Sequence, residues 1–154
     1  MLYGFTEYAI YTAGASATGV QVYNNIFSAT GTNILMSQMT SGVVSDYNLY
    51  YAPSTTRWDW NGGAVGSFAG LQAASGQEAH SLNVAPQFAS ATPSFASDFR
   101  LSASSPAIHA GTFIAIEPDY AGVTMDNPPS LGAYSGTTRT YRVNSLRVNR
   151  ITTR

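Results

Sequence analysis

The sequence predicts an all-β protein in which short parallel strands wind into a coil, and three observations favour this fold. The segments VYNNIF and SDYNLY nearly repeat each other, ending at Phe27 and at Tyr50, and their flanking residues also match. Each period contains short alternating segments, and none contains a run of about ten residues with helical spacing. Charged residues make up only 10% of the chain, which suits strands and tight turns better than amphipathic helices. A period of this length indicates a solenoid with about three short strands per turn, each pairing with its equivalent one turn away.

The repeat places Asn25 and Asn48 at equivalent bends between strands. Asparagine tolerates the left-handed backbone angles of a sharp bend better than most non-glycine residues. If the two residues stack one turn apart, their amides can also exchange hydrogen bonds inside the coil. Two coincidental asparagines are the alternative, and the matching flanks favour a structural ladder.

The sequence lacks the residues or segments that several kinds of site and targeting signal require. The chain has no cysteine, which excludes a disulfide framework and a thiolate metal site. The N-terminal stretch MLYGFTEYAI lacks the basic start and apolar run of a signal peptide. No stretch approaches the roughly 18 apolar residues of a membrane span, so we expect no membrane insertion.

The sequence divides into terminal coils (residues 1–60), a cap that continues them (61–136) and a basic tail (137–154). STTRWDWNGGAVGS is predicted to be a loop because of its glycines and polar residues. SFAGLQAASG predicts one short helix, with Ser67 as its N-cap, Phe68 and Leu71 on one face, and Gly76 at its end. We expect the cap to cover the open end of the coils and to hide strand edges that would otherwise aggregate.

The basic tail contains five of the seven arginines and no acidic residue. Such a segment could bind an anionic polymer or nucleic acid. Only Tyr141 among its residues could stack on a base. We therefore predict a solvated arm and no nucleic-acid partner.

GVQVYNNIFSATGTNILMSQMTSGVVSDYNLYY resembles the last coils of right-handed parallel β-helix proteins, the pectate-lyase-like architecture with its asparagine ladder. The pieces GQEAHSLNVAPQF, DFRLSASSPAIHAG and DYAGVTMDNPPSLGAYSG resemble, in this order, the C-terminal section of the bacterial surface group called choice-of-anchor Q. Together they cover roughly residues 10–136. The resemblance implies a right-handed parallel β-helix at the cell surface or outside the cell, with polysaccharide as its partner. Two positions depart from the group, which usually has Asp at His109 and an acidic-Ile pair at Ser130-Leu131.

The stretch Arg57-Trp58-Asp59-Trp60 is the strongest candidate for ligand binding. Two tryptophans can present flat faces to the apolar side of a sugar ring, while arginine and aspartate bind its hydroxyls or carboxylates. The alternative is that one or both tryptophans pack beneath the cap loop.

Glu78 and His80 are separated by a single residue, so on a strand they would face the same way. They could form an acid/base pair or hold a metal, but a hydrogen-bonded pair that fixes the cap is favoured, as the resemblance also implies. His109, in a bend after Ser105-Pro106, is predicted to be structural.

Three acidic residues lie in a proline-rich loop, where they could bind calcium: Glu117, Asp119 and Asp126. Their spacing does not match an EF-hand loop. We therefore predict no cofactor, with calcium as the alternative.

No catalytic constellation is visible. Lyases of the resembled architecture abstract a proton with a basic residue beside a cation, whereas lysine is absent here and Arg57 is the only arginine near the coils. The hydrolases need clustered aspartates, and Asp46 and Asp59 lie well apart in the chain without a third. We therefore predict a segment that binds or scaffolds polysaccharide without a complete catalytic site. The alternatives are the end of the substrate groove of a polysaccharide lyase or glycoside hydrolase, and a phage tailspike-like protein.

The N-terminal side of the coils is predicted to be open. Solenoids need about three repeats, and the sequence shows two clear ones, with Ile10-Tyr11 as part of an incomplete first coil, about one period before Ile34-Leu35. Strand edges in residues 1–25 would then face water. We expect this edge to contact upstream coils or a second copy of the chain.

Overall fold

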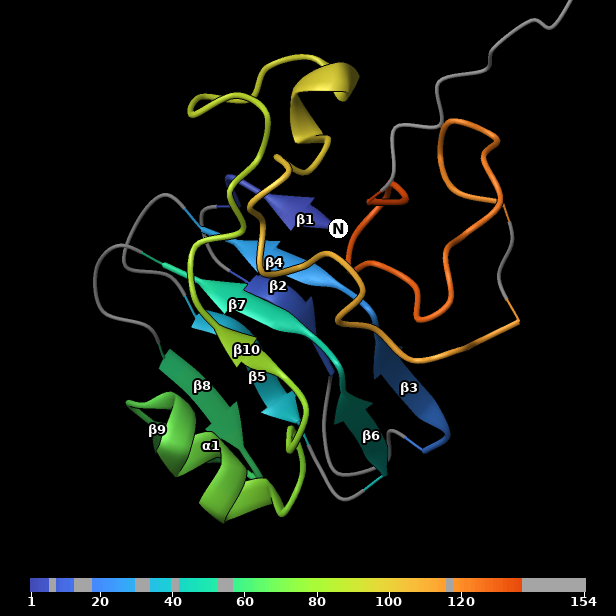
Figure 1. Cartoon of the computed structure of the whole chain (residues 1–154). Coiled ribbons are helices and arrows are strands. Elements are labelled where there is room, and N and C mark those ends of the chain that lie inside the picture. Colours follow the sequence, from blue (N-terminus) through green and yellow to red (C-terminus); the bar gives the residue numbers. More distant parts are fainter. Residues whose placement is uncertain are drawn as a thin grey trace, which may run out of the picture.

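The computed structural model describes residues 1–5, 8–12, 18–29, 34–39, 42–52, 57–115 and 118–136. Ten short strands account for most of its regular structure, together with one α-helix and one short 3-10 helix (Figure 1). The predicted all-β class is therefore confirmed. Within the described ranges, no helix has the length and apolar character needed to cross a bilayer. The basic tail predicted at 137–154 lies outside the described residues.

The strands form three sheets. The first sheet has the order β1 (Leu2–Tyr3), β4 (Ile26–Ser28), β7 (Leu49–Tyr51) and β10 (Leu82–Asn83), with every pair parallel. The second has the order β2 (Tyr8–Tyr11), β5 (Ile34–Met39), β8 (Arg57–Trp60) and β9 (Gly63–Val65), and only β9 is antiparallel to its neighbour. The third consists of the parallel strands β3 (Val20–Tyr23) and β6 (Val43–Asp46).

The sequence repeat is visible in the strand register. Val20 pairs with Val43 in the third sheet, and Ile26 pairs with Leu49 in the first. Ile34 pairs with Arg57 in the second sheet, at the same offset along the chain. Positions one period apart therefore pair along the first and third sheets, whereas in the second sheet the register shifts after this pair, so that Met36 faces Trp58 and Met39 faces Trp60. The segment around Ile10 also pairs with the segment around Ile34, as predicted. The register differs from the predicted one, because Ile10 aligns with Met36 and Tyr8 aligns with Ile34.

The main core draws residues from all three sheets, because apolar side chains of β3, β4, β6, β7 and β8 gather in one cluster. Phe27 and Tyr50 are fully buried and stack with centroids 5.2 Å apart and planes inclined by 12°. Trp58 meets Tyr50 edge to face at 5.7 Å. Aromatic pairs in these geometries add stabilisation beyond the area that they bury.

The helix α1 (Phe68–Ser75) confirms the prediction for this segment. The Ser67 hydroxyl accepts a hydrogen bond from the Gly70 backbone N–H at 3.1 Å, and Gly76 ends the helix in the left-handed conformation. Leu71 is buried against the main core, and Phe68 packs beside it. Figure 1 shows α1 next to β9, at the end of the sheets opposite β1.

The loop predicted over residues 54–67 is wrong in its middle part. Arg57–Trp60 and Gly63–Val65 form an antiparallel hairpin in which Trp60 pairs with Gly63. The two turn residues, Asn61 and Gly62, both have positive φ, at 49° and 76°. Asn-Gly is the preferred sequence for this tight turn, because both positions require left-handed backbone angles.

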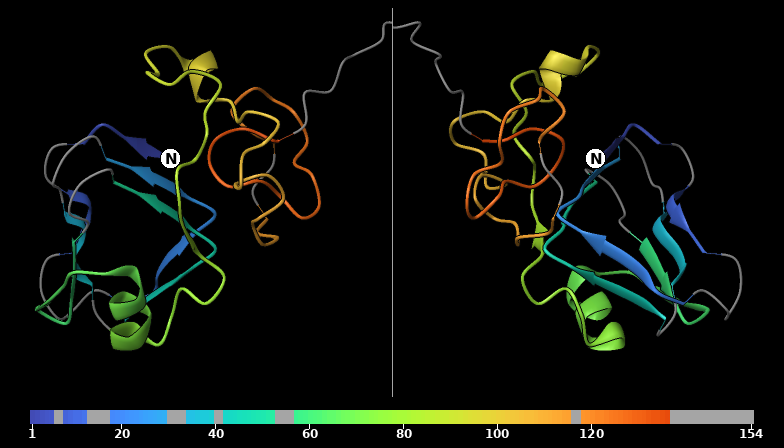
Figure 2. Two further views of the ribbon diagram at one scale, coloured as in Figure 1. Left: turned by 60° about the vertical axis from the view of Figure 1, so that its left-hand side comes forward. Right: turned by 90° about the vertical axis from the view of Figure 1, so that its right-hand side faces the viewer.

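The C-terminal part of the predicted cap takes a different position from the one expected. Ala107 and Leu131 pack against Ile26 and Leu49, and none of these four side chains belongs to the main core. Both views in Figure 2 place the orange and red segment beside the first sheet. The short 3-10 helix (Ala96–Phe99) belongs to the same region. Side chains from residues 88–110, together with Leu131, therefore cover the outer face of the first sheet, whereas α1 packs at one end.

Candidate functional site

The sugar-binding prediction for Trp58 and Trp60 is wrong. Trp58 is fully buried and Trp60 is 7% exposed, and both belong to the main core. Alternation along β8 turns both rings inward, so neither face can meet a sugar. Asp59, between them, is partly exposed, and the side chain of Arg57 lies outside the described part of the structure. The alternative was that one or both tryptophans pack beneath the cap loop, and the structure places both in the main core, with Trp58 beside Phe68 of α1.

Asn25 and Asn48 occupy equivalent positions, but only the Asn48 side chain makes the inward hydrogen bonds expected of an asparagine ladder. Asn48 is fully buried, and its Oδ1 accepts a hydrogen bond from the Asn25 backbone N–H at 3.0 Å. Its Nδ2 donates to the Val22 carbonyl at 2.8 Å and to the Ser45 hydroxyl at 3.1 Å. The ladder therefore runs from side chain to backbone, and the expected exchange between the two amides does not occur.

The left-handed backbone angles predicted at Asn25 and Asn48 occur one residue earlier in each bend. Asn24 and Tyr47, which precede the ladder residues, have φ values of 57° and 54°. Asn25 is only half-buried, and its Nδ2 donates to the nearby Tyr23 carbonyl at 2.8 Å. The bend thus uses two neighbouring positions, one for the backbone turn and the next for the inward hydrogen bonds.

Ser81, just before β10, continues these hydrogen bonds toward the next strand of the first sheet. Its hydroxyl accepts from the Asn48 backbone N–H at 2.7 Å and donates to the buried carboxyl of Glu78. Glu78 is 1% exposed and accepts a second hydrogen bond from the Tyr50 hydroxyl at 2.8 Å. Burial raises the pKa of Tyr50 well above its usual range, and the neighbouring Glu78 adds to this effect. Glu78 is therefore a structural residue: it is the last member of the buried chain of hydrogen bonds that runs from Asn48 through Ser81.

His80 lies on the surface and does not pair with Glu78, because residues 79–80 form a turn and not a strand. Its ring stacks on Tyr47 with centroids 4.6 Å apart and planes 8° apart. The Nδ1 atom lies 2.7 Å from Oδ2 of Asp46, and the backbone N–H donates to Oδ1 at 2.8 Å. Burial acts to raise the pKa of Asp46, but hydrogen bonds from His80 and Tyr47 outweigh it and lower that pKa. The expected pair thus becomes two separate contacts that hold the chain after α1.

Asn24 connects the bend between β3 and β4 to the C-terminal segment. Its Oδ1 accepts from the Thr112 backbone N–H at 2.9 Å, and its Nδ2 donates to the Thr112 carbonyl at 2.7 Å. The Asn24 carbonyl also accepts from the Gly132 backbone N–H at 2.8 Å. Two segments from far along the chain are therefore fixed to one bend.

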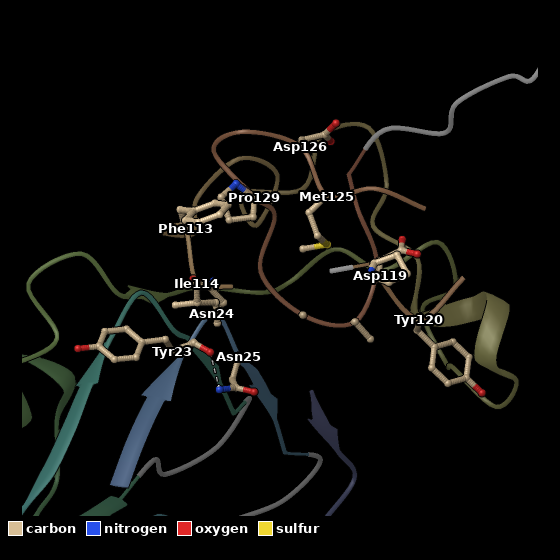
Figure 3. Close-up of a pocket in the computed structure, with 13 residues that line it drawn as sticks. Tyr23, Asn24, Asn25, Phe113, Ile114, Asp119, Tyr120, Met125, Asp126 and Pro129 are labelled. Atoms are coloured by element: carbon tan, nitrogen blue, oxygen red, sulfur yellow. Dashed lines mark hydrogen bonds between the residues drawn. The ribbon is translucent and has the colours of Figure 1, made fainter. Parts of the chain in front are cut away.

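A cavity of about 270 Å³ lies beside this junction (Figure 3). The β3–β4 bend forms one side of it, and residues from 113–114 and 118–133 form the rest. Phe113 and Tyr120 belong to its lining and are 71% and 73% exposed. Figure 3 shows Tyr23 and Tyr120 at opposite sides of the cavity, with their rings extending outward in this view and Met125 extending toward the middle. The cavity therefore combines exposed aromatic rings with an apolar interior.

The acidic residues considered for calcium hold loops in place. Asp119 accepts hydrogen bonds from three backbone N–H groups, those of Ala121, Val123 and Ser135, each at 2.8 Å. Asp126 accepts from the Ser135 hydroxyl at 2.9 Å. Glu117 lies outside the described residues, and no group of three potential ligands occurs among those described.

His109 has a structural role in a bend, since its φ is 54° and its backbone N–H donates to the buried Ser130 hydroxyl at 3.2 Å. Its Nε2 lies 3.4 Å from Oδ2 of Asp126. Ser105, just before, donates its hydroxyl to the Pro86 carbonyl. These contacts connect three parts of the C-terminal segment.

No family model matches the chain, and neither the comparison with curated proteins nor the comparison with solved structures gives a match.

The sequence did not reveal the cavity, because its walls come from segments that lie far apart in the chain and share no motif. Phe113 is a partial signal, since it is a large apolar residue in a segment rich in glycine, proline and polar residues. Such a residue is either buried or available to a ligand. Only the packing of residues 107–133 against the β3–β4 bend distinguishes these two outcomes.

Proposed function

We propose that the chain is the C-terminal segment of a right-handed parallel β-helix, of the pectate-lyase-like kind with a choice-of-anchor Q type end, in a secreted or surface protein that binds polysaccharide. Parallel pairing at the offset of the sequence repeat, in three sheets, supports the β-helix. Parallel crossover connections are right-handed in almost all proteins, which supports the hand.

The observation that carries polysaccharide binding is the cavity lined by Tyr23, Phe113 and Tyr120. Exposed aromatic rings give flat apolar faces, and tyrosine hydroxyls and the Asn25 amide give hydrogen-bonding groups, which together suit a pyranose ring. The connection through Asn24 fixes the cavity walls, so little ordering accompanies binding.

We propose no catalytic role for this chain. Asp119 and Asp126 make loop contacts, and Glu78 is buried, so these carboxyls are not positioned as an exposed acid/base pair. The Asp46 carboxyl also contacts a histidine, His80, whose ring is stacked on Tyr47. This pair holds the chain in place. The alternative, the end of a lyase or hydrolase groove, places any catalytic residues on other coils.

The edge formed by β1, β2 and β3 is the proposed contact for neighbouring coils. Each of these strands pairs on one side only among the described strands. Leu2, Tyr8 and Tyr11 are exposed there, at 39%, 41% and 53%. Unpaired edges of this kind template pairing with another strand, either of upstream coils or of a second copy.

Affinity electrophoresis in native gels containing dissolved polysaccharides tests this proposal. We expect the chain to be retarded by at least one polysaccharide, while a reference protein of similar mass and charge is not. The same preparation should release no unsaturated products from polygalacturonate, measured by their ultraviolet absorbance. Equal mobility in every gel would contradict polysaccharide binding, and product release would establish the lyase alternative.

A further inference from the structure

We infer that the cavity beside Asn24 binds one uncharged sugar residue of a polysaccharide, with the neighbouring sugars on the exposed rings of Phe113 and Tyr120. This inference rests on the proposed polysaccharide binding and names its site and its class of ligand. Three properties of the cavity carry it: its size, its charge and its rigidity.

The size suits a single sugar ring. The cavity of about 270 Å³ lies just below the range of roughly 300–1,000 Å³ typical of sites for drug-sized molecules. Ile114, Met125 and Pro129 provide apolar walls, which match the C–H face of a pyranose. Phe113 and Tyr120 are 71% and 73% exposed, and although the Tyr120 ring meets Tyr134 edge to face at 5.7 Å, both rings leave surface on which neighbouring sugars can stack.

The charge disfavours uronates. The thirteen lining residues include Asp119 and Asp126 but no basic residue. His109, the basic group that contacts Asp126, is outside the lining. A sugar carboxylate in the cavity would lie near the carboxylates of Asp119 and Asp126, and like charges repel at this range. Hydroxyl groups carry no such penalty, and the Asn25 amide, whose Nδ2 already donates to Tyr23, presents an Oδ1 that can accept from a hydroxyl.

The rigidity of the walls favours a preformed site. A side chain added at Gly111 would lie 2.8 Å from Oδ1 of Asn24 and 2.9 Å from the Pro129 carbonyl oxygen, which shows how closely the two walls approach. Gly111 also donates its backbone N–H to Pro129 at 2.8 Å. The two walls are therefore held together at the junction by close packing and by a backbone hydrogen bond.

A larger cavity, of about 570 Å³, lies between Tyr3, Tyr51 and residues 85–93. Its aromatic residues pack on one another, since the Tyr3 ring meets Phe88 and Phe99 edge to face at 6.1 and 5.1 Å. None of the aromatic residues that line it is among the exposed large apolar residues, whereas Phe113 and Tyr120 are. The cavity beside Asn24 is thus the better site for a sugar.

Isothermal titration calorimetry on the full chain tests the inference with four probes: an uncharged hexasaccharide of glucose, one of mannose, one of galactose, and a hexagalacturonate. The variants Phe113→Ala and Tyr120→Ala remove the exposed rings. Phe95→Ala is the matched control, because Phe95 is equally exposed, at 74%, and does not line the cavity. We expect the wild type to bind at least one uncharged hexamer, and each ring variant to bind it about tenfold or more weakly, while Phe95→Ala binds as the wild type does.

The other outcomes overturn the inference in distinguishable ways. Binding of the hexagalacturonate alone, lost in the ring variants, would refute the uncharged class but keep the proposed function. Binding of an uncharged hexamer that both ring variants retain would refute the site and keep the function. Binding of no hexamer, together with normal mobility in every polysaccharide gel, would overturn both proposals. Circular dichroism spectra that match the wild type show that a variant is folded.

Discussion

Replacing Asn48 by alanine removes the central hydrogen bonds of the ladder. The fully buried amide joins segments on neighbouring strands: it accepts from Asn25, before β4, and donates to Val22 in β3 and to Ser45 in β6. Alanine keeps the backbone conformation but supplies none of these bonds. The methyl group also leaves the space of the amide empty.

The size of the effect follows from what each partner loses. Three hydrogen bonds at a net value of about 1 kcal/mol each give about 3 kcal/mol of lost stability. The Asn25 N–H loses the partner shown in the structure, whereas the Val22 carbonyl retains the Ser45 hydroxyl at 3.4 Å. We therefore expect Asn48→Ala to lower the free energy of unfolding by about 2–4 kcal/mol.

Urea unfolding followed by circular dichroism measures this change. A shift of the transition midpoint gives the change in the free energy of unfolding when the dependence of that energy on urea concentration is the same in both proteins. Asn25→Ala is the matched control, since Asn25 occupies the equivalent position but is half-buried and its side chain donates locally, to Tyr23. We expect that control to lose about 1 kcal/mol or less. Equal losses in the two variants, or a loss below about 0.5 kcal/mol for Asn48→Ala, would refute the ladder.

Three further predictions concern other parts of the chain. The pKa of Asp46 is lowered in the folded protein from its ordinary 3.8, so its contribution to stability is present above about pH 4 and is lost as the pH falls through the folded pKa. Asp46→Asn should therefore show a smaller loss of stability in acid than the wild type in urea titrations, and parallel curves would contradict this. Gly111→Ala should lose about 1–3 kcal/mol by overpacking against Asn24, whereas Gly66→Ala, which meets nothing within 4 Å, should stay within about 1 kcal/mol of the wild type. Light scattering of the purified chain should show self-association through the β1–β3 edge as concentration rises, and a monomer at every concentration would count against this contact.

The strand register and the helix could be predicted because local chemistry determines them. The echo between VYNNIF and SDYNLY reports directly on which strands are neighbours, since equivalent positions pair in the sheets. Likewise, Ser67 and Gly76 mark the ends of α1 through hydrogen bonding and left-handed geometry that any context requires. The Asn61-Gly62 hairpin carried an equally local signal, and the loop prediction overlooked it.

Burial of the tryptophans could also have been inferred from the sequence. Arg-Trp-Asp-Trp alternates polar and apolar residues, which is the pattern of a half-buried strand with its apolar side inward. The position of residues 85–135 was harder to predict. A clue lies in β4 and β7, whose residues are apolar on both faces, because such strands must be covered on both sides.

The central claim is that the folded chain binds an uncharged polysaccharide in the cavity beside Asn24, and backbone amide NMR shifts test it most directly. Titration with the uncharged hexamer that binds best should move the signals of Asn25, Phe113 and Gly132, which line the cavity. The signals of Trp58 and Trp60, in the core, should stay in place. Shifts concentrated on β8, or on residues 85–93 around the larger cavity, would contradict the account, as would a spectrum unchanged at saturating sugar.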